Sequence, residues 1–255
     1  TGEDTLSLHD ALPISHDTWL DRLLFRIHPA ITMLGLIALA FAQFLVVLDA
    51  SIVNIALPSL GSELNLSTTT LSGVITAYVL PFGGLLLLGG RLSDRFGHRR
   101  LFMTGVAGFA LASAAAGMAT SGAWLLTARA IQGASAALLA PAALALVTKL
   151  FANPKDRAKA LGIWGAVAGI GSAAGVLLGG VLTASLGWSA VFYVNVPVAA
   201  LILAAVPFLI AKDSVGERLS LDMSGSAAVT AGIVALVAAL SGTERVGWTA
   251  PQTLI

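Results

Sequence analysis

Seven long apolar blocks, separated by shorter polar stretches, dominate the pattern of the chain. They cover residues 30–57, 69–90, 101–120, 123–148, 160–184, 188–210 and 223–241. A bilayer core about 30 Å thick needs about 20 apolar residues in a helix, so each block is long enough to span it. The blocks are continuously apolar, whereas the strands of a membrane barrel alternate over about ten residues. The pattern therefore predicts an all-α integral membrane protein.

The first 28 residues precede these blocks and have a different character. Residues 1–14 contain the string TLSLHDALPI, which matches one translation frame of a common sequencing adapter. We interpret residues 1–14 as foreign to the protein, with an ordinary polar N-terminus as the alternative. Residues 15–28 place apolar side chains on one helical face, with Arg22 and Arg26 opposite. This arrangement predicts an interfacial amphipathic leader, with a flexible leader as the alternative.

The composition excludes several classes of protein. Of the 255 residues, 57% are hydrophobic and 11% are charged, and the mean hydropathy is +0.90. About a quarter of a soluble domain is charged, so this chain could not cover a soluble surface. A net charge of +1 argues against a nucleic-acid partner, and the absence of cysteine excludes disulfides and thiolate metal sites. We find no phosphate loop, no metal-ligand spacing and no Ser/His pair, so we expect no enzyme, no metal and no cofactor.

Lysine and arginine fall in alternate connections between the blocks. Twelve of the 14 lie in the leader or after the second, fourth and sixth blocks, and the connections after the first, third and fifth have none. Basic connections stay on the cytoplasmic side of a membrane. We therefore expect a multi-pass protein of the cell (inner) membrane with its N-terminus in the cytoplasm.

Two ionisable side chains interrupt the apolar blocks at matching depth. Asp49 lies late in the first block and Arg129 early in the fourth, so the predicted topology puts both near the outer leaflet. A charge inside the bilayer costs at least a few kcal/mol, and both must therefore face protein or water. We expect them to share a polar cavity, where Asp49 binds and releases a proton and Arg129 is its partner. A structural pair that orients two helices is the alternative.

Two amides lie near these charges in the sequence. Gln132 is one helical turn from Arg129 on the same face, and Asn54 follows Asp49 by five residues. We interpret both as candidates to line a substrate cavity. Amides that only hold helices together are the alternative.

The connection over residues 90–100 reads GRLSDRFGHRR. Gly97 is expected at a turn position that needs unusual backbone geometry. Asp94 lies among arginines, which predicts an ion-pair latch at the membrane surface. The spacing resembles the signature loop of the major facilitator superfamily. The residues that match this loop are Gly90, Leu92, Asp94, Arg95, Gly97 and Arg99.

Three further segments resemble motifs of the drug:proton antiporters in that superfamily. They are LDASIVNIALP at 48–58, RAIQG at 129–133 and GSAAGVLLGG at 171–180. The last motif has Val176 where the family has proline, which removes an expected kink. The glycines of this motif are expected to pack closely against another helix, and generic membrane packing is the alternative. They are Gly171, Gly175, Gly179 and Gly180.

The resemblance covers residues 30–255 and implies a domain organisation. Residues 29–210 would form the six-helix N-terminal half, 211–222 a cytoplasmic loop, and 223–255 a seventh transmembrane helix with the start of an outer loop. The short connection before residue 223 is more like the fourteen-span branch of the family. We therefore expect an N-terminal fragment whose partner is the missing C-terminal half of the same protein.

The resemblance also implies a function, namely proton-coupled multidrug efflux by alternating access. The expected partners are protons, the lipid bilayer and a small hydrophobic or cationic substrate. A transporter of the same fold that takes up or exports a metabolite is the alternative, and the loss of proline at Val176 keeps it open. A seven-helix receptor or retinal protein fits less well, because the predicted N-terminus is inside and residues 223–241 contain no lysine.

Overall fold

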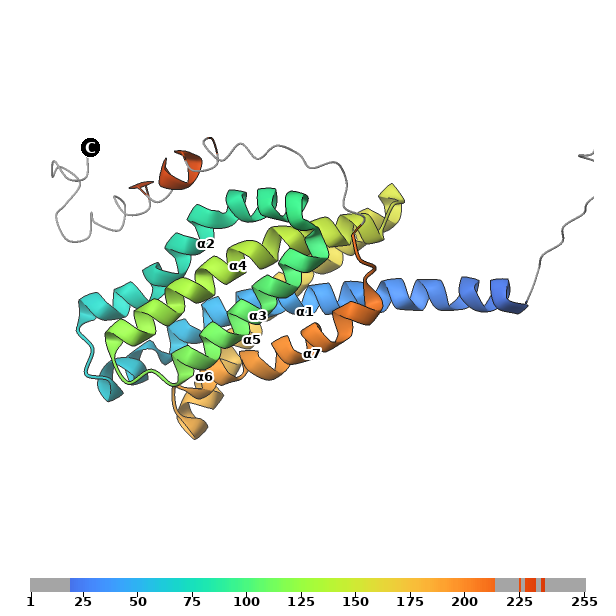
Figure 1. The fold of residues 1–255 in the computed structure, drawn as a ribbon. Helices are drawn as coiled ribbons and strands as arrows, with labels where there is room; N and C mark the ends of the chain where they lie inside the picture. The colour runs from blue at the N-terminus through green and yellow to red at the C-terminus, as the bar shows by residue number, and fades with distance from the viewer. Residues whose placement is uncertain (1–18, 214–224, 226–227, 233–234, 237–255) are drawn as a thin grey trace, which may run out of the picture.

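The computed structural model describes residues 19–213, 225, 228–232 and 235–236. Within these ranges the chain forms a bundle of long helices (Figure 1). The helices are α1 (Trp19–Glu63), α2 (Thr68–Phe96), α3 (His98–Gly117), α4 (Gly122–Leu150), α5 (Pro154–Leu186), α6 (Ala190–Tyr193) and α7 (Asn195–Leu209). The described part of the chain contains six segments long and apolar enough to cross a membrane, the sixth running through α6 and α7. The prediction of an all-α membrane fold is confirmed.

The helix boundaries follow from local chemistry. The hydroxyl of Ser67 accepts the Thr70 N–H at 3.2 Å and caps α2, and that of Ser121 accepts the Trp124 N–H at 3.4 Å and caps α4. The Asn153 side chain accepts the Lys155 N–H at 2.9 Å at the start of α5. Pro154 then occupies the first turn of α5, where its missing N–H costs nothing.

The sixth span has a one-residue break near its start. Val194 separates α6 from α7, but its φ of −59° and ψ of −27° stay helical, and the span runs on from Ala190 to Leu209. Pro197, three residues further on, lacks the N–H that would bond to the Tyr193 carbonyl, and its ring crowds that carbonyl. The break places Asn195 at the first position of α7.

Three of the predicted boundaries differ from the structure or lie outside it. The first span does not begin as a separate unit, because α1 is one continuous helix from Trp19 to Glu63 that includes residues 19–28 of the expected leader. The expected seventh helix over 223–241 falls largely on residues outside the described ranges. Residues 1–18 are also outside them.

Helix α4 is the central element of the bundle. It packs along α2 and α3, while α1 pairs with α5 and α7 packs on α1 and α3 (Figure 1). Glycines permit these close approaches. A Cβ atom on Gly89 of α2 would overlap the carbonyl oxygen of Ala137, and one on Gly133 of α4 would overlap that of Tyr78. Small residues at membrane helix contacts are expected, because dispersion between closely packed backbones drives association in lipid.

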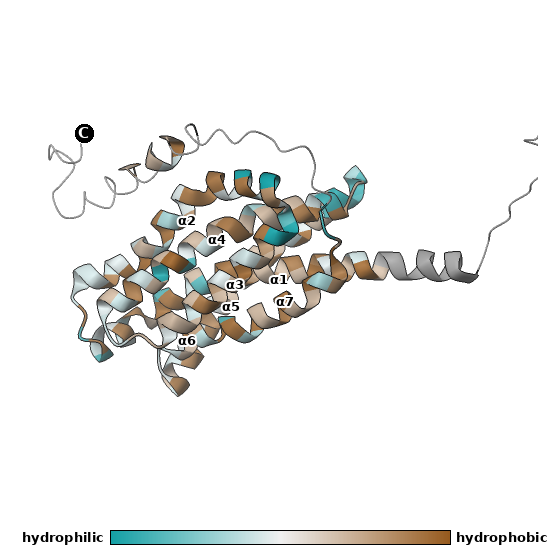
Figure 2. Cartoon of the chain, viewed as in Figure 1, coloured by the Kyte–Doolittle hydropathy of each residue, from teal (hydrophilic) through white to brown (hydrophobic). Residues whose placement is uncertain are grey.

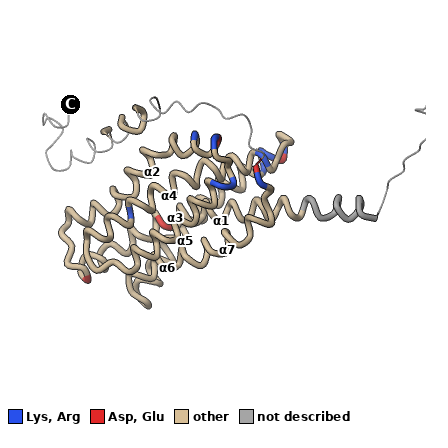
Figure 3. Tube along the Cα trace, in the orientation of Figure 1, with Lys and Arg blue, Asp and Glu red and all other residues tan. Residues whose placement is uncertain are grey.

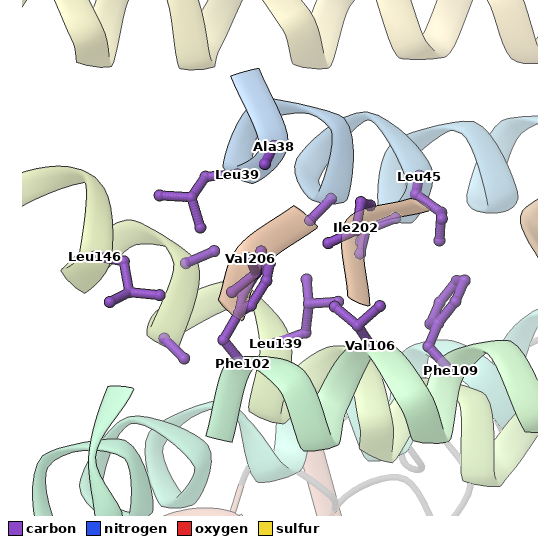
Figure 4. Packing of buried hydrophobic residues seen from close by; sticks show 14 of the residues in the cluster. Ala38, Leu39, Leu45, Phe102, Val106, Phe109, Leu139, Leu146, Ile202 and Val206 are labelled. Carbon is purple, nitrogen blue, oxygen red and sulfur yellow. The ribbon is translucent and has the colours of Figure 1, made fainter. Parts of the chain in front are cut away.

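Apolar side chains fill the interior and also cover the outside of the bundle. The main core cluster joins α1, α3, α4 and α7 and includes Leu45, Phe102, Phe109, Leu139, Ile202 and Val206 (Figure 4). On the outside, Leu111, Leu177 and Phe208 are 74%, 71% and 86% exposed. Brown, hydrophobic residues run along all the helices in Figure 2. An apolar exterior of this extent is suited to lipid rather than to water.

Candidate functional site

A buried ion pair lies inside the bundle, between α1 and α4. Arg129 Nη1 donates to Asp49 Oδ2 at 2.5 Å, and the side chains are 2% and 0% exposed. The two residues are 80 positions apart in the chain, and the packing of α4 against α1 brings them together. Two side chains that touch must lie at the same depth along the bundle, which is the arrangement that the sequence indicates for Asp49 and Arg129.

Three neutral polar side chains complete this cluster. Gln132 Nε2 donates to Asp49 Oδ1 at 2.7 Å, and Asn195 Nδ2 donates to the same oxygen at 2.9 Å. Both amides also donate to Ser113 Oγ, at 3.3 and 3.0 Å. The Ser113 hydroxyl in turn donates to the Phe192 carbonyl at 2.8 Å. We call Asp49, Ser113, Arg129, Gln132 and Asn195 the polar cluster.

Aromatic rings from α2 and α6 flank the arginine of the polar cluster. The guanidinium carbon of Arg129 lies 4.3 Å from the centre of the Tyr78 ring and 5.9 Å from that of Phe192. The Arg129 Nε donates to the Val74 carbonyl at 3.4 Å, and Nη1 also donates to Gln132 Oε1 at 2.7 Å. Removing two charges from water costs several kcal/mol each, so a buried pair is tolerable only when other hydrogen bonds satisfy it, as here.

The chemistry available to the polar cluster is proton binding and release. Asp49 is its one carboxyl group, and the hydrogen bonds to that group from Arg129, Gln132 and Asn195 all come from donors. Among the residues that the structure describes, no three histidine, aspartate or glutamate side chains lie close enough to hold a metal ion.

The structure separates the two expected cavity amides. Gln132 is fully buried within the polar cluster. Asn54 lies on the exposed side of α1, and its amide donates to the Ala50 carbonyl of its own helix at 2.9 Å. The two residues therefore do not line one common surface in this structure.

The loop between α2 and α3 is a single tight turn at Gly97. Its φ of +94° is open to glycine and strained for other residues. Arg95 lies over the Phe96 ring at 5.5 Å, and a Cβ atom added to Gly90 would lie 3.8 Å from the Pro141 Cβ of α4, an ordinary contact distance. Among the described residues, the expected pairing of Asp94 with arginines is not present. Asp94 is 56% exposed, and its carboxylate lies 4.0 Å from His98 Nδ1.

The acid that engages this turn is Asp213, which the sequence reasoning missed. Its Oδ2 accepts the Arg99 backbone N–H at 2.9 Å, where Gly97 offers α3 no side-chain cap, and its Oδ1 pairs with Lys149 Nζ at 2.9 Å. Burial alone would raise the pKa of Asp213. The hydrogen bond from Arg99 and the contact with Lys149 outweigh burial, so its pKa lies below the ordinary value of 3.8. An acid directly after the sixth apolar block, on the basic side of the bundle, was the available signal.

The glycines of the fifth span pack against α1. A Cβ on Gly175 would lie 2.6 Å from the Ser51 Cβ, and one on Gly179 would lie 3.0 Å from the Ile55 Cβ. A Cβ on Gly171 would lie 3.2 Å from the Phe44 carbonyl oxygen. Gly180 is an exception to the packing prediction, because a Cβ there meets nothing within 4 Å. It follows Gly179 by about 100° of helix rotation and points away.

Helix α5 is continuous at the position where the family motif has proline. Val176 is 51% exposed and lies within one unbroken helix from Pro154 to Leu186. The loss of the expected kink is therefore visible in the fold.

Ser113 and Asn195 are the members of the polar cluster that sequence reasoning missed. Both are uncharged residues inside apolar blocks, where a neutral polar side chain is less conspicuous than a charge. A polar side chain two residues before proline, inside a membrane-length block, was the signal for Asn195.

Six membrane-length helices around a buried acid–arginine pair define a polytopic α-helical membrane protein. The family model described as Major Facilitator Superfamily matches residues 39–241. The chain belongs to the Major Facilitator Superfamily, and this family points to a transporter rather than an enzyme.

Relatives of this chain are named for drug resistance and export. A puromycin resistance protein of Streptomyces alboniger is 50% identical over 217 residues, which are 85% of this chain and 43% of that protein. A cephamycin export protein of Amycolatopsis lactamdurans is 45% identical over 84% of this chain and 44% of that protein. The chain thus spans less than half the length of these relatives.

Solved structures show the same fold at low sequence identity. A peptide transporter in complex with sulfate aligns with a TM-score of 0.64 at 19% identity, over 86% of this chain and 48% of that one. The superfamily's helical arrangement is therefore retained in this chain.

Proposed function

We propose that the full-length protein exports small, hydrophobic or cationic drugs in exchange for protons. Asp49 carries the proton, Arg129 is its charged partner, and the export cycle alternates access between the two sides of the membrane. The observation that carries the proposal is the buried Asp49–Arg129 pair in a superfamily transporter fold. An ionisable pair inside a membrane domain is costly and typically serves a proton or substrate path.

The names of the relatives support drug export as the direction and cargo. The two relatives above are named for puromycin resistance and cephamycin export, and a third, from Streptomyces glaucescens, for tetracenomycin C resistance and export. Transfer of this cargo class to the present protein is part of the proposal. A metabolite transporter of the same fold is the second candidate, favoured by the unkinked α5 at Val176.

The distribution of charge supports a cytoplasmic N-terminus in the cell membrane. Lysine and arginine gather at one end of the described bundle, where α2 and α4 end and α5 begins (Figure 3). The positive-inside rule assigns that end to the cytoplasm. The turn at Gly97 then lies in the cytoplasm, where the Asp213–Lys149 contact, in place of the expected Asp94 ion pair, forms the latch.

Polar side chains along the seam of α1 and α5 support a substrate path there. Asn54 is exposed on α1, and the Ser51 hydroxyl donates to Ser172 Oγ of α5 at 3.3 Å near the same surface. An apolar groove of about 350 Å³ continues along this seam, lined by residues that include Met33, Phe41 and Ile170. Exposed polar groups at membrane depth favour a water-filled cavity over lipid, so Asn54 is a candidate cavity residue.

The decisive experiment replaces Asp49 by asparagine in the full-length protein. Asparagine has the shape of aspartate but cannot titrate, so we expect Asp49→Asn to abolish pH-gradient-driven transport of ethidium in everted membrane vesicles. Glu63→Gln is the matched control. It makes the same chemical change on the same helix, at an acid that contacts Ser59 and Trp188 outside the polar cluster. We expect it to transport normally.

Folding is controlled with a second variant. Asp49→Asn leaves Arg129 buried without its counter-charge, which can cost about 3–5 kcal/mol. The double variant Asp49→Asn/Arg129→Gln removes both charges and should be recovered in membranes if the single variant is not. Gradient-driven ethidium transport by either recovered variant would refute the role of Asp49. Gradient-driven uptake of a substrate into cells, rather than its export, would favour the second candidate function, a metabolite transporter.

A further inference from the structure

We propose that Asn195 is a hydrogen-bond switch that changes from donor to acceptor when Asp49 is protonated. It donates to the charged carboxylate, and when Asp49 is protonated its side-chain amide turns over and accepts the new O–H. This inference rests on the proposed function, because it takes Asp49 as the group that binds the proton.

The neighbours of Asp49 are arranged for its charged form. Arg129 donates to Oδ2, and Gln132 and Asn195 both donate to Oδ1. None of these contacts comes from an acceptor, so an O–H on Asp49 would find no hydrogen-bond partner among them. Burial makes an unpaired O–H expensive, so one neighbour must offer an acceptor when Asp49 is protonated.

Asn195 holds the acceptor that is needed. Its Oδ1 is buried and has no hydrogen-bond partner among the described residues. Its Nδ2 faces two acceptors, Asp49 Oδ1 at 2.9 Å and Ser113 Oγ at 3.0 Å. Because the Ser113 hydrogen is used on the Phe192 carbonyl, these contacts fix the donor orientation in the charged state. Rotation about the terminal side-chain bond exchanges the two ends of the amide without moving the helix. In the turned state Oδ1 faces Asp49 and Ser113, and the Ser113 hydroxyl rotates its hydrogen from the Phe192 carbonyl to Oδ1.

Gln132, the other amide at Asp49, cannot make the same exchange. Its Oε1 accepts from Arg129 Nη1 at 2.7 Å. Turning its amide would direct an NH₂ group at the guanidinium, which has only donors. Gln132 is therefore locked, and Asn195 is the amide of the polar cluster that is able to turn.

The other groups that face Asp49 do not replace this switch. Arg129 from α4 and Tyr78 from α2 are the ionisable ones, and α3 and α7 supply the neutral Ser113 and Asn195. The glycines of α5 that lie on α1 carry no polar side chain. Tyr78 Oη is also buried without a hydrogen-bond partner among the described residues, which makes it the competing acceptor.

The position of Asn195 gives the switch a mechanical consequence. It is the first residue of α7, directly after the break at Val194, and Ser113 ties the preceding turn at Phe192 to α3. A change at its amide is therefore felt where the sixth span is least continuous. Protonation of Asp49 on α1 would be transmitted to α3 and α7 through Asn195.

The test uses the full-length protein with Asn195→Leu and Asn195→Ala, which both lack the amide. Both variants lose the amide NH₂ that donates to charged Asp49 and the amide oxygen that accepts from neutral Asp49. The first loss costs more free energy, because a hydrogen bond to a charged group is stronger than one to a neutral group. The pH at half-maximal ethidium transport should therefore rise by about one unit. Tyr78→Phe is the control and should leave this pH unchanged.

Infrared difference spectra distinguish the role of Asn195 as a donor from its role as an acceptor. They are taken between acidic and alkaline pH on purified protein in lipid. The carboxylic C=O band that is missing in Asp49→Asn belongs to protonated Asp49. Without an acceptor for its O–H, this band should move to higher wavenumber in both Asn195 variants and stay in place in Tyr78→Phe. A variant that fails to accumulate is replaced by the other, since alanine and leucine disturb packing in opposite directions.

Each outcome has a defined meaning. A raised midpoint with a displaced band supports the switch. A raised midpoint with an unmoved band leaves Asn195 as a donor only and overturns it, as does an unmoved midpoint. A band displaced by Tyr78→Phe assigns the acceptor to Tyr78 and also overturns it. Failure of the proposed function is recognised separately. In that case the Asp49→Asn variant would still transport ethidium with the same pH dependence, and its spectrum would still contain the carboxylic C=O band.

Discussion

At the scale of single residues, two of the acidic side chains in the described chain lie in contrasting environments. Asp49 is enclosed by donors at the centre of the bundle, while Asp213 lies at the basic end and holds the first turn of α3 to Lys149 of α4. The first setting suits a group that exchanges protons. The second suits a fixed structural contact, because its carboxylate caps a helix whose own N-cap is glycine.

Asp213→Ala should lower the stability of the full-length protein in detergent by about 1 kcal/mol, the usual worth of a helix cap. The pKa of Asp213 is lowered in the folded state, so its contribution is complete above the ordinary value of 3.8 and is lost as pH falls through the folded value. The difference in melting temperature between the two proteins should therefore be constant near neutral pH and shrink only below about pH 4.

Asp156→Ala is the control for this measurement. Asp156 is a 54% exposed acid that lies 4.0 Å from Lys159, and its loss should change stability by less than about 0.5 kcal/mol. A difference for Asp213→Ala that grows as pH falls would contradict the assignment.

At the scale of elements, helix contacts depend on a few glycines at backbone crossings. Gly133 allows α4 to approach the Tyr78 carbonyl of α2, one turn from Arg129, and the glycines of α5 do the same for α1. These crossings join α4, which carries Arg129, to α2, and α1, which carries Asp49, to α5.

Gly133→Ala should destabilise the protein by about 1–3 kcal/mol, because the added methyl group meets a backbone carbonyl that cannot rotate away. Gly180→Ala adds the same methyl group on α5, where nothing lies within 4 Å, and should be neutral or slightly stabilising. Melting temperatures of the two purified variants in detergent decide this. Equal loss in both would show that Gly180 also packs closely.

At the scale of the whole molecule, the basic residues gather at one end of the bundle and the polar cluster is embedded within it (Figure 3). Under the positive-inside rule this asymmetry favours the cytoplasmic latch proposed above. The chain contains no cysteine, so single cysteines can report the orientation directly.

In intact cells, a membrane-impermeant maleimide should label Thr120→Cys, which lies in the exposed turn between α3 and α4. Lys155→Cys, exposed at the start of α5, should be labelled only after the cells are permeabilised. Both signals require the N-terminus to be cytoplasmic. The reverse pattern would invert the topology and put the Asp213 contacts outside the cell.

The sequence by itself determined the class, the number of described spans and the residues with charge inside the membrane. Spans are readable because lipid demands a continuous run of apolar residues with internal backbone hydrogen bonds. Asp49 and Arg129 were readable because an intramembrane charge is rare and costly. The loop motif indicated the turn at Gly97, where only a small set of backbone conformations closes so short a connection.

Only the tertiary structure decided which partners these residues have. Asn195, Ser113 and Asp213 look ordinary in the sequence, and they gain roles because helices distant in the chain bring them to Asp49 or to the start of α3. Gly180 was expected in a helix contact, but its angular position on α5 faces it away from helix packing. Asn54 remains a candidate cavity residue, on a face of α1 that is separate from the polar cluster. Periodicity fixes which residues share a face of one helix, whereas the face that meets another helix is set by close packing between both, and a single sequence does not encode that contact locally.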